Sequence, residues 1–208
     1  MRFTLKYRGP LPAQGSSTGS RVPEKQAIRR YLHPQLKDLW ERDTNRLAEI
    51  DPRTLETAVW KGQTFDVPRP IHGFSQFFFR YPLGGFNFVP LVTSLQEAHC
   101  ELAVRLHRPT PPGSILYEGG DLDNRLKVLF DALRIPTTLE EIDDEPPKED
   151  GEVLYCLLAD DRLITRVSIK SLRLLGQNPG GENYVDIDMD VTVQAVTPMG
   201  GTLALLFH

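Results

Sequence analysis

Several segments of the chain alternate hydrophobic and polar residues with a period of two, which is typical of half-buried β-strands. The clearest covers residues 97–108, where every second position from Ala98 to Leu106 is apolar. Further segments predict strands at 2–7, 153–158, 164–175 and 184–196, and a weaker one at 202–207. The chain is therefore expected to contain at least one β-sheet.

A period near 3.6 residues predicts a helix over residues 122–134, because five large apolar side chains fall in one narrow stripe. These are Leu122, Leu126, Leu129, Phe130 and Leu133. Residues 23–43 predict a longer helix, since Pro23 suits a first helical turn and a rough apolar face follows it. That face consists of Ala27, Tyr31, Leu36 and Trp40. A further short helix is expected over residues 52–60.

Together these elements predict one α/β (α+β) domain over residues 1–208, with a mixed sheet packed by a few helices. A chain of 208 residues suffices for one sizeable core and is short for two. Residues 9–90 are expected to form a helical and irregular N-terminal extension, with a loop at 9–21 and an irregular stretch at 66–90. The phenylalanines of that stretch pack in a core or interface, or stack on unpaired bases. They are Phe77, Phe78, Phe79, Phe86 and Phe88.

Composition limits the function classes only in part. No apolar run approaches the roughly 18 residues that span a membrane, and the N-terminus lacks the apolar core of a signal peptide, so we expect a cytoplasmic protein without membrane contact. The net charge of −4 counts against a surface that binds nucleic acid everywhere, although a local basic groove is compatible with it. Cys100 and Cys156 lie in strand-like apolar segments and are expected to be buried reduced thiols.

Two carboxylates stand where a loop enters the helix at 122–134. The sequence there reads Gly119-Gly120-Asp121-Leu122-Asp123-Asn124, and Lys127 follows one helical turn later. Asp121 is placed to cap the helix, where negative charge is favoured, and Asp123 and Lys127 share a helix face. On its own, such a pair of acids is more often a cap with a solvated charge than a functional site.

A second pair of acids, Asp160 and Asp161, follows the strand at 153–158. On its own this pair is usually a turn. If the strand lies beside the start of the helix, however, Asp161 can meet Asp121 and Asp123. Three oxygen donors of this kind suit Mg²⁺ or Mn²⁺ rather than zinc, and such ions promote cleavage of phosphodiesters. Lys127 would then neutralise charge that develops on the phosphate, or assist the attacking water.

The combined pattern resembles the RusA-type Holliday-junction resolvases. The resemblance covers about residues 97–170 and rests on several elements that occur in the family's order. They are Asp121-Leu122-Asp123-Asn124, Lys127, Phe130-Asp131-Ala132-Leu133, and Asp160-Asp161 followed by Val167.

This resemblance implies a RusA-like fold and a homodimeric, Mg²⁺-dependent endonuclease. The implied substrate is branched DNA, above all the four-way junctions of recombination and repair. It also implies that Asp121, Asp123 and Asp161 bind the metal and act in catalysis, and that Lys127 is required as well.

The chain departs from the family in the loop before the motif. Family members carry several arginines there, whereas residues 112–118 contain no basic residue. Five basic residues near the motifs are candidates to contact DNA phosphates: Arg125, Arg162, Arg166, Lys170 and Arg173. Three on the helix at 23–43 are further candidates: Arg29, Arg30 and Lys37. For both sets the alternative is an ordinary solvated surface.

Two acidic features leave alternatives open. The segment 138–152 is an insertion relative to the family, and is either a solvated loop or a flap that competes with DNA. Asp186, Asp188 and Asp190 alternate along one strand, which favours an exposed sheet face over a metal site. The leading hypothesis is thus a nuclease acting on branched DNA. The alternatives are an inactive or differently targeted nucleic-acid-binding protein of the same fold, and a structural domain with surface acids.

Overall fold

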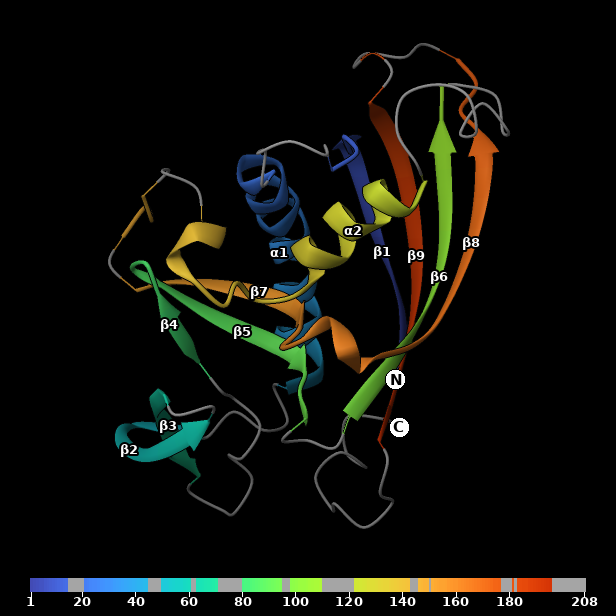
Figure 1. Ribbon diagram of the computed structural model, residues 1–208. Helices are drawn as coiled ribbons and strands as arrows, with labels where there is room; N and C mark the ends of the chain where they lie inside the picture. The colour runs from blue at the N-terminus through green and yellow to red at the C-terminus, as the bar shows by residue number, and fades with distance from the viewer. Residues whose placement is uncertain are drawn as a thin grey trace.

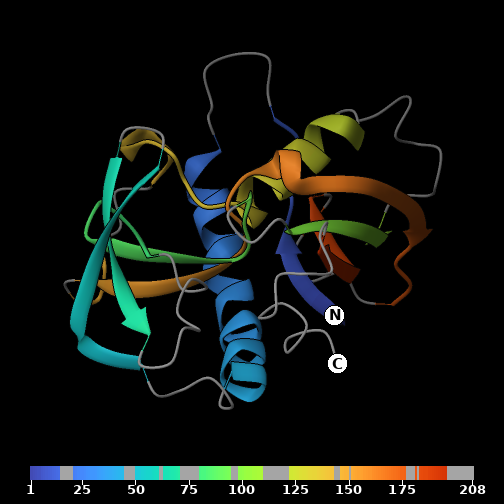
Figure 2. The same cartoon turned by 90° about the horizontal axis from the view of Figure 1, so that it is seen from below.

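The structure, a computed structural model, describes residues 1–14, 21–44, 50–60, 63–70, 80–94, 98–109, 122–142, 146–149, 151–176, 181 and 183–195. For 40–44, 50–60, 63–70 and 195 it describes the backbone alone. Within these ranges the chain forms two larger sheets, a two-stranded ribbon and two α-helices (Figures 1 and 2). This arrangement confirms the mixed α+β class.

The larger sheet, called sheet A, has four strands in the order β1-β9-β6-β8. They are β1 (Arg2–Pro10), β9 (Tyr184–Ala195), β6 (Ala98–Arg108) and β8 (Ile164–Arg173). β9 runs antiparallel to β1 and β6, while β6 and β8 are parallel. Along β6 the even-numbered side chains are buried and the odd-numbered ones are half-buried, as the alternation predicts. The strands expected in these four regions are confirmed.

The smaller sheet has the order β4-β5-β7, and a separate ribbon joins β2 and β3. Its strands are β4 (Tyr81–Leu83), β5 (Phe86–Val92) and β7 (Glu152–Leu158), and the ribbon consists of β2 (Ile50–Trp60) and β3 (Gln63–Pro70). The predicted helix at 52–60 is therefore wrong. This segment contains several β-branched residues, and its pairing with β3 holds its backbone in an extended conformation. The irregular stretch at 66–90 likewise contains strands, and the expected boundary at residue 90 falls inside β5.

Helix α1 (Val22–Thr44) passes between the two larger sheets (Figures 1 and 2). Its side chains form hydrogen bonds with backbone groups of one edge strand in each sheet. Gln35 accepts a hydrogen bond from the Lys6 amide at 2.9 Å and donates to the Lys6 carbonyl at 2.7 Å. His33 Nδ1 accepts from the Tyr155 amide on β7 at 3.0 Å. Edge strands expose unpaired backbone groups, so these polar side chains complete both sheets and hold them to one helix.

The buried face of α1 shares Leu36 with the predicted face and otherwise differs from it. Ile28, Leu32 and Leu36 line it, whereas Ala27 and Tyr31 are exposed. The side chain of Trp40 lies outside the described residues. Long basic residues also point inward from this helix, and a hydrophobic pattern cannot reveal such positions.

Helix α2 (Leu122–Leu133) covers the even-numbered face of β6 and follows its predicted stripe. Leu126, Leu129 and Leu133 are buried in the same core as the inward side chains of sheet A. Cys100 and Cys156 are buried free thiols, as expected, and burial raises the pKa of each to about 12. Neither α1 nor α2 carries an apolar stretch long enough to cross a membrane.

Candidate functional site

The first half of the predicted site lies on the first turns of α2. The helix begins at Leu122, where the motif predicts it, with Asp123 in its first turn. Asp123 and Lys127 are both exposed, and neither has a hydrogen bond or ion pair with a described residue. Asp121 lies outside the described residues. Asp123 and Lys127 therefore present side-chain charges at the surface that no described residue neutralises.

Arg125 lies between them in sequence but points inward. Its side chain is 2% exposed and donates to the carbonyl of Leu11 and to Asn183 Oδ1. The amide of Gln14 also donates to the carbonyl of Asn124 at 3.2 Å. The prediction that Arg125 contacts phosphate is corrected by this placement. Arg125 instead fastens the start of α2 to the end of sheet A at which β9 begins.

The C-terminal end of α2 is capped by a residue of α1. Arg29 is 2% exposed and donates to the carbonyls of Asp131 at 2.9 Å, Arg134 at 3.2 Å and Glu141 at 3.2 Å. Burial lowers the pKa of its guanidinium below the ordinary value. The last carbonyls of a helix need such donors. Arg29 therefore holds the fold together and is not a surface phosphate contact.

An ion-pair cluster surrounds this cap. Lys25 pairs with Asp131 at 2.7 Å, and Arg134 makes two hydrogen bonds of 2.9 Å to the Glu141 carboxylate. Although burial alone would raise it, these bonds and one from the Thr137 amide hold the pKa of Glu141 below its ordinary value. Asp131, part of the motif that resembles the family, is thus already engaged within the fold.

The second half of the site follows the end of β7. The Ile135 amide, just after α2, donates to the Leu158 carbonyl at 2.9 Å, and the Ala159 amide donates to the Val92 carbonyl at 2.9 Å. These bonds fix the point at which the chain leaves the strand. The next residues form the short 3₁₀ turn η4 (Asp161–Leu163), which contacts α2. The two halves of the predicted site therefore lie on neighbouring elements.

The two acids of this half have different surroundings. Asp160 accepts from the Arg162 amide at 3.0 Å and pairs with the Arg162 guanidinium at 2.7 Å, so it caps the turn. The side chain of Asp161 is exposed and makes no hydrogen bond or ion pair with a described residue. The pKa of Arg134 is raised, chiefly by its hydrogen bonds with Glu141, and the charge of Asp161 adds to this effect. Asp161 therefore lies toward the C-terminal end of α2.

Whether these residues can hold a metal ion depends first on their chemistry. Exposed aspartates supply the oxygen ligands that Mg²⁺ and Mn²⁺ prefer, so the donor type fits. Within the described ranges, no three His, Cys, Asp or Glu side chains gather closely enough to form a complete ligand set. Asp121, the third predicted ligand, falls outside those ranges.

The basic residues predicted to contact DNA occupy different parts of the surface. Arg162 is exposed beside Asp161, and its bonds with Asp160 raise the pKa of its guanidinium. Arg166 and Lys170 are exposed on β8, where strand register pairs them with Glu101 and Arg105 of β6. That face of sheet A is opposite the one that α2 covers. Arg166 and Lys170 therefore face away from the acids on α2.

The same open face carries the three alternating aspartates of β9. Asp188 pairs with Lys6 at 3.6 Å, and Asp190 pairs with Arg105 at 2.6 Å. The Arg105 hydrogen bond also holds the pKa of Asp190 below its ordinary value. Asp186 pairs with Arg8 in the same way. The three aspartates therefore lie half-buried in ion pairs along an open face of the sheet.

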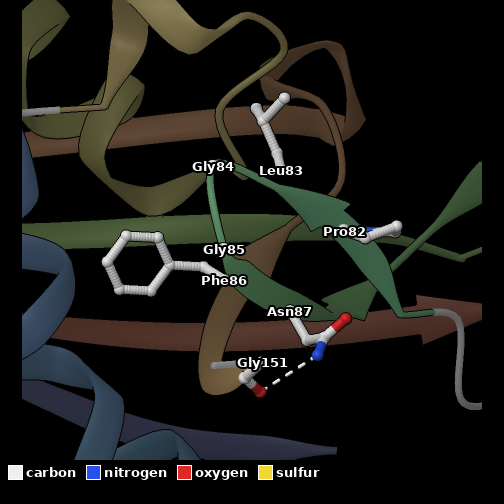
Figure 3. A pocket seen from close by; sticks show the side chains of 7 residues that line it. All are labelled: Pro82, Leu83, Gly84, Gly85, Phe86, Asn87 and Gly151. Carbon is white, nitrogen blue, oxygen red and sulfur yellow. Dashed lines mark hydrogen bonds between the residues drawn. The ribbon is translucent and has the colours of Figure 1, made fainter. Parts of the chain in front are cut away.

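The described part of the acidic segment packs against the β4–β5 hairpin and is not a free flap. Gly84 and Gly85 form the turn with φ of 59° and 80°. An added Cβ at Gly84 would lie 2.9 Å from Ile142 Cδ1. The Gly151 amide donates to the Gly85 carbonyl, and Asn87 Nδ2 reaches the Gly151 carbonyl at 3.0 Å, beside a pocket of about 440 Å³ (Figure 3). Both ends of the segment are therefore fixed to the folded body.

Sequence reasoning missed two arginines that the structure makes prominent. Arg29 was grouped with surface cations, and its partners lie more than 100 residues away along the chain. Arg108 was not singled out, although it occupies the next even position after Leu106 and so continues the buried face of β6. That alternation was the available signal for Arg108. Phe86 and Phe88, by contrast, are buried core residues, as the first of the two readings predicted, while Phe77–79 lie outside the described residues.

Comparisons with protein-family models, with curated proteins and with solved structures found no match for this chain. The resemblance to RusA-type resolvases therefore rests on the motif residues themselves.

Proposed function

We propose that this protein is a divalent-metal-dependent endonuclease of the RusA type that acts on branched DNA. The observation that supports this most is that η4, the turn that carries Asp161, packs against α2, the helix that carries Asp123 and Lys127, although Asp161 lies toward the other end of that helix. The two halves of the motif are more than 30 residues apart in the sequence. The packing of η4 against α2 does not by itself require an acidic residue on each of the two elements.

The contrast between engaged and free charges also supports this function. Asp131 and Asp160 lie close to the motif residues in sequence, and both are bound to basic side chains. Asp123, Lys127 and Asp161 remain exposed without a described partner. Solvated charges are common on protein surfaces, but here the unpaired ones coincide with the motif positions, which is what a ligand-binding site requires.

In this proposal Asp121, Asp123 and Asp161 hold Mg²⁺ or Mn²⁺. When bound, such an ion neutralises charge on the phosphate and activates a water molecule. Lys127, one turn from Asp123, lies on the same helix face and supplies positive charge toward the phosphodiester. Arg162 adds a cation beside Asp161. The proposed partners are four-way or otherwise branched DNA and a second copy of the chain, and the proposed location is the cytoplasm.

A substrate panel tests the proposal. The purified chain is incubated with labelled four-way, flap and linear duplex DNA in Mg²⁺, Mn²⁺ or EDTA. We expect cutting of the four-way junction with either metal and none in EDTA, and a loss of about 100-fold or more in Asp123→Asn. Asp190→Asn, which removes an acid from the open face, serves as the matched control. Binding without cutting at any metal concentration would favour the alternative of an inactive binding protein.

A further inference from the structure

Arg108 is a buried arginine without a counter-charge. It ends β6 and is 3% exposed. Its Nε and Nη1 are sealed from solvent and have no hydrogen-bond partner. Among the described residues no carboxylate lies within ion-pair distance of it, and burial lowers the pKa of its guanidinium. Burying an unpaired charge costs folding free energy. We therefore expect that Arg108 binds an anionic ligand that is not part of the chain.

The two other buried arginines show how this chain normally satisfies such a group. Arg29 donates to three backbone carbonyls and to Gln26. Arg125 donates to the Leu11 carbonyl and to Asn183. Both are used to fasten elements together. Arg108 makes no side-chain bond to a described residue, so it does not share this structural role.

Strand register places Arg108 on the side of sheet A that carries the motif. The even-numbered face of β6 is the one that α2 covers, and Arg108 continues that face. α2 starts at the same end of the sheet, because Arg125 binds Asn183 just before β9, and β9 begins beside the end of β6. Figure 1 shows the N-terminal end of α2 lying toward this end of β6.

A second cation lies beside it. Arg173 at the end of β8 is the register partner of Arg108 and therefore shares its face. Arg173 is exposed, and no described acid pairs with it. Arg108 Nη2 is not among the sealed atoms. A buried guanidinium with one accessible nitrogen and a neighbouring exposed cation is a suitable receptor for a phosphate group, since guanidinium binds phosphate through charge-assisted hydrogen bonds.

We propose that Arg108, assisted by Arg173, is an anion site that binds a phosphate group of the DNA backbone near the start of α2, the helix that carries Asp123. The DNA source of the phosphate rests on the proposed function. Such a site would supply positive charge that residues 112–118, which contain no arginine, do not provide. It lies on the α2 side of the sheet, unlike Arg166 and Lys170.

Urea unfolding with and without inorganic phosphate tests the anion site independently of cleavage. Chloride holds the ionic strength constant, and Arg2→Met, an exposed arginine of β1, controls for the general stabilisation by phosphate. In the absence of phosphate we expect Arg108→Met to be at least as stable as the wild type, because an unpaired buried charge is removed. We expect phosphate to raise the midpoint of the wild type and of Arg2→Met, and to raise that of Arg108→Met markedly less. Arg108→Lys should retain part of the phosphate effect.

DNA binding measured in EDTA identifies the source of the phosphate. Arg108→Met should weaken binding of a labelled four-way junction by about 10-fold or more, Arg173→Met by less, and Arg2→Met by less than about twofold. The proposal is overturned if Arg108→Met is clearly less stable than the wild type and phosphate stabilises both equally, since Arg108 would then have an internal partner. If phosphate stabilisation depends on Arg108 but the wild type binds no DNA, the anion site stands and the nuclease proposal fails.

Discussion

Replacing Arg29 by methionine is predicted to destabilise the fold without removing a DNA contact. The change keeps a long apolar side chain but removes three hydrogen bonds to the carbonyls of Asp131, Arg134 and Glu141. Each bond contributes about 1 kcal/mol net, so the expected loss in unfolding free energy is about 3 kcal/mol. Removing the desolvated charge offsets part of the gross interaction, which is why the net value per bond is used.

Urea denaturation followed by circular dichroism measures this loss. The unfolding midpoint should fall in Arg29→Met, while the dependence of the free energy on urea should be unchanged. Arg2→Met, on the surface of β1, should change stability by less than about 0.5 kcal/mol. If Arg29→Met proved as stable as the wild type but bound DNA more weakly, the structural role argued for Arg29 would be refuted and the surface reading restored.

Two further predictions concern pH and the hairpin turn. Burial is the main cause that lowers the pKa of His33 below its ordinary 6.5 in the folded chain, so the unfolded chain binds more protons and stability falls as pH drops through about 6.5. His33→Asn keeps an acceptor for the Tyr155 amide and does not titrate; urea midpoints at pH 7.5 and 5.5 should therefore differ less in this variant. Gly84→Ala should cost about 1–2 kcal/mol, because φ is positive and its Cβ would meet Ile142. The loss of stability in Gly84→Ala should exceed that in Gly176→Ala, where φ is also positive but no atom lies within 4 Å of the added Cβ. Equal losses in the two variants would show that contact with Ile142 does not contribute.

Local periodicity predicted the elements whose packing is simple. α2 buries one stripe against one sheet face, and β6 alternates because one of its faces is covered, so both could be located from the sequence. The region of β2 was wrongly predicted to be a helix. It forms a strand because it pairs with β3, and this tertiary contact cannot be read from the local sequence pattern. For α1 the extent was predicted but the buried face was not, since its inward arginine finds acceptors that only the fold brings near.

The candidate site was predicted in its residues more than in its geometry. The start of α2 and the acids after β7 follow from local sequence. The turn η4 contacts α2, but Asp161 lies toward the C-terminal end of this helix and not beside its start, where the prediction placed it. The side of the sheet on which Arg166 and Lys170 lie depends on strand register and order, which one sequence does not determine. Asp121 falls outside the described residues, so its prediction as a ligand remains a prediction.

Cleavage by the adjacent variants Asp160→Asn and Asp161→Asn tests the central claim most directly. The two substitutions remove the same charge from neighbouring residues, but Asp160 caps η4 and pairs with Arg162, whereas Asp161 is exposed and free. With a four-way junction and Mg²⁺, we predict that Asp161→Asn loses cleavage by about 100-fold or more, while Asp160→Asn retains most of it once folding is verified. Equal rates in Asp161→Asn and the wild type would contradict the account.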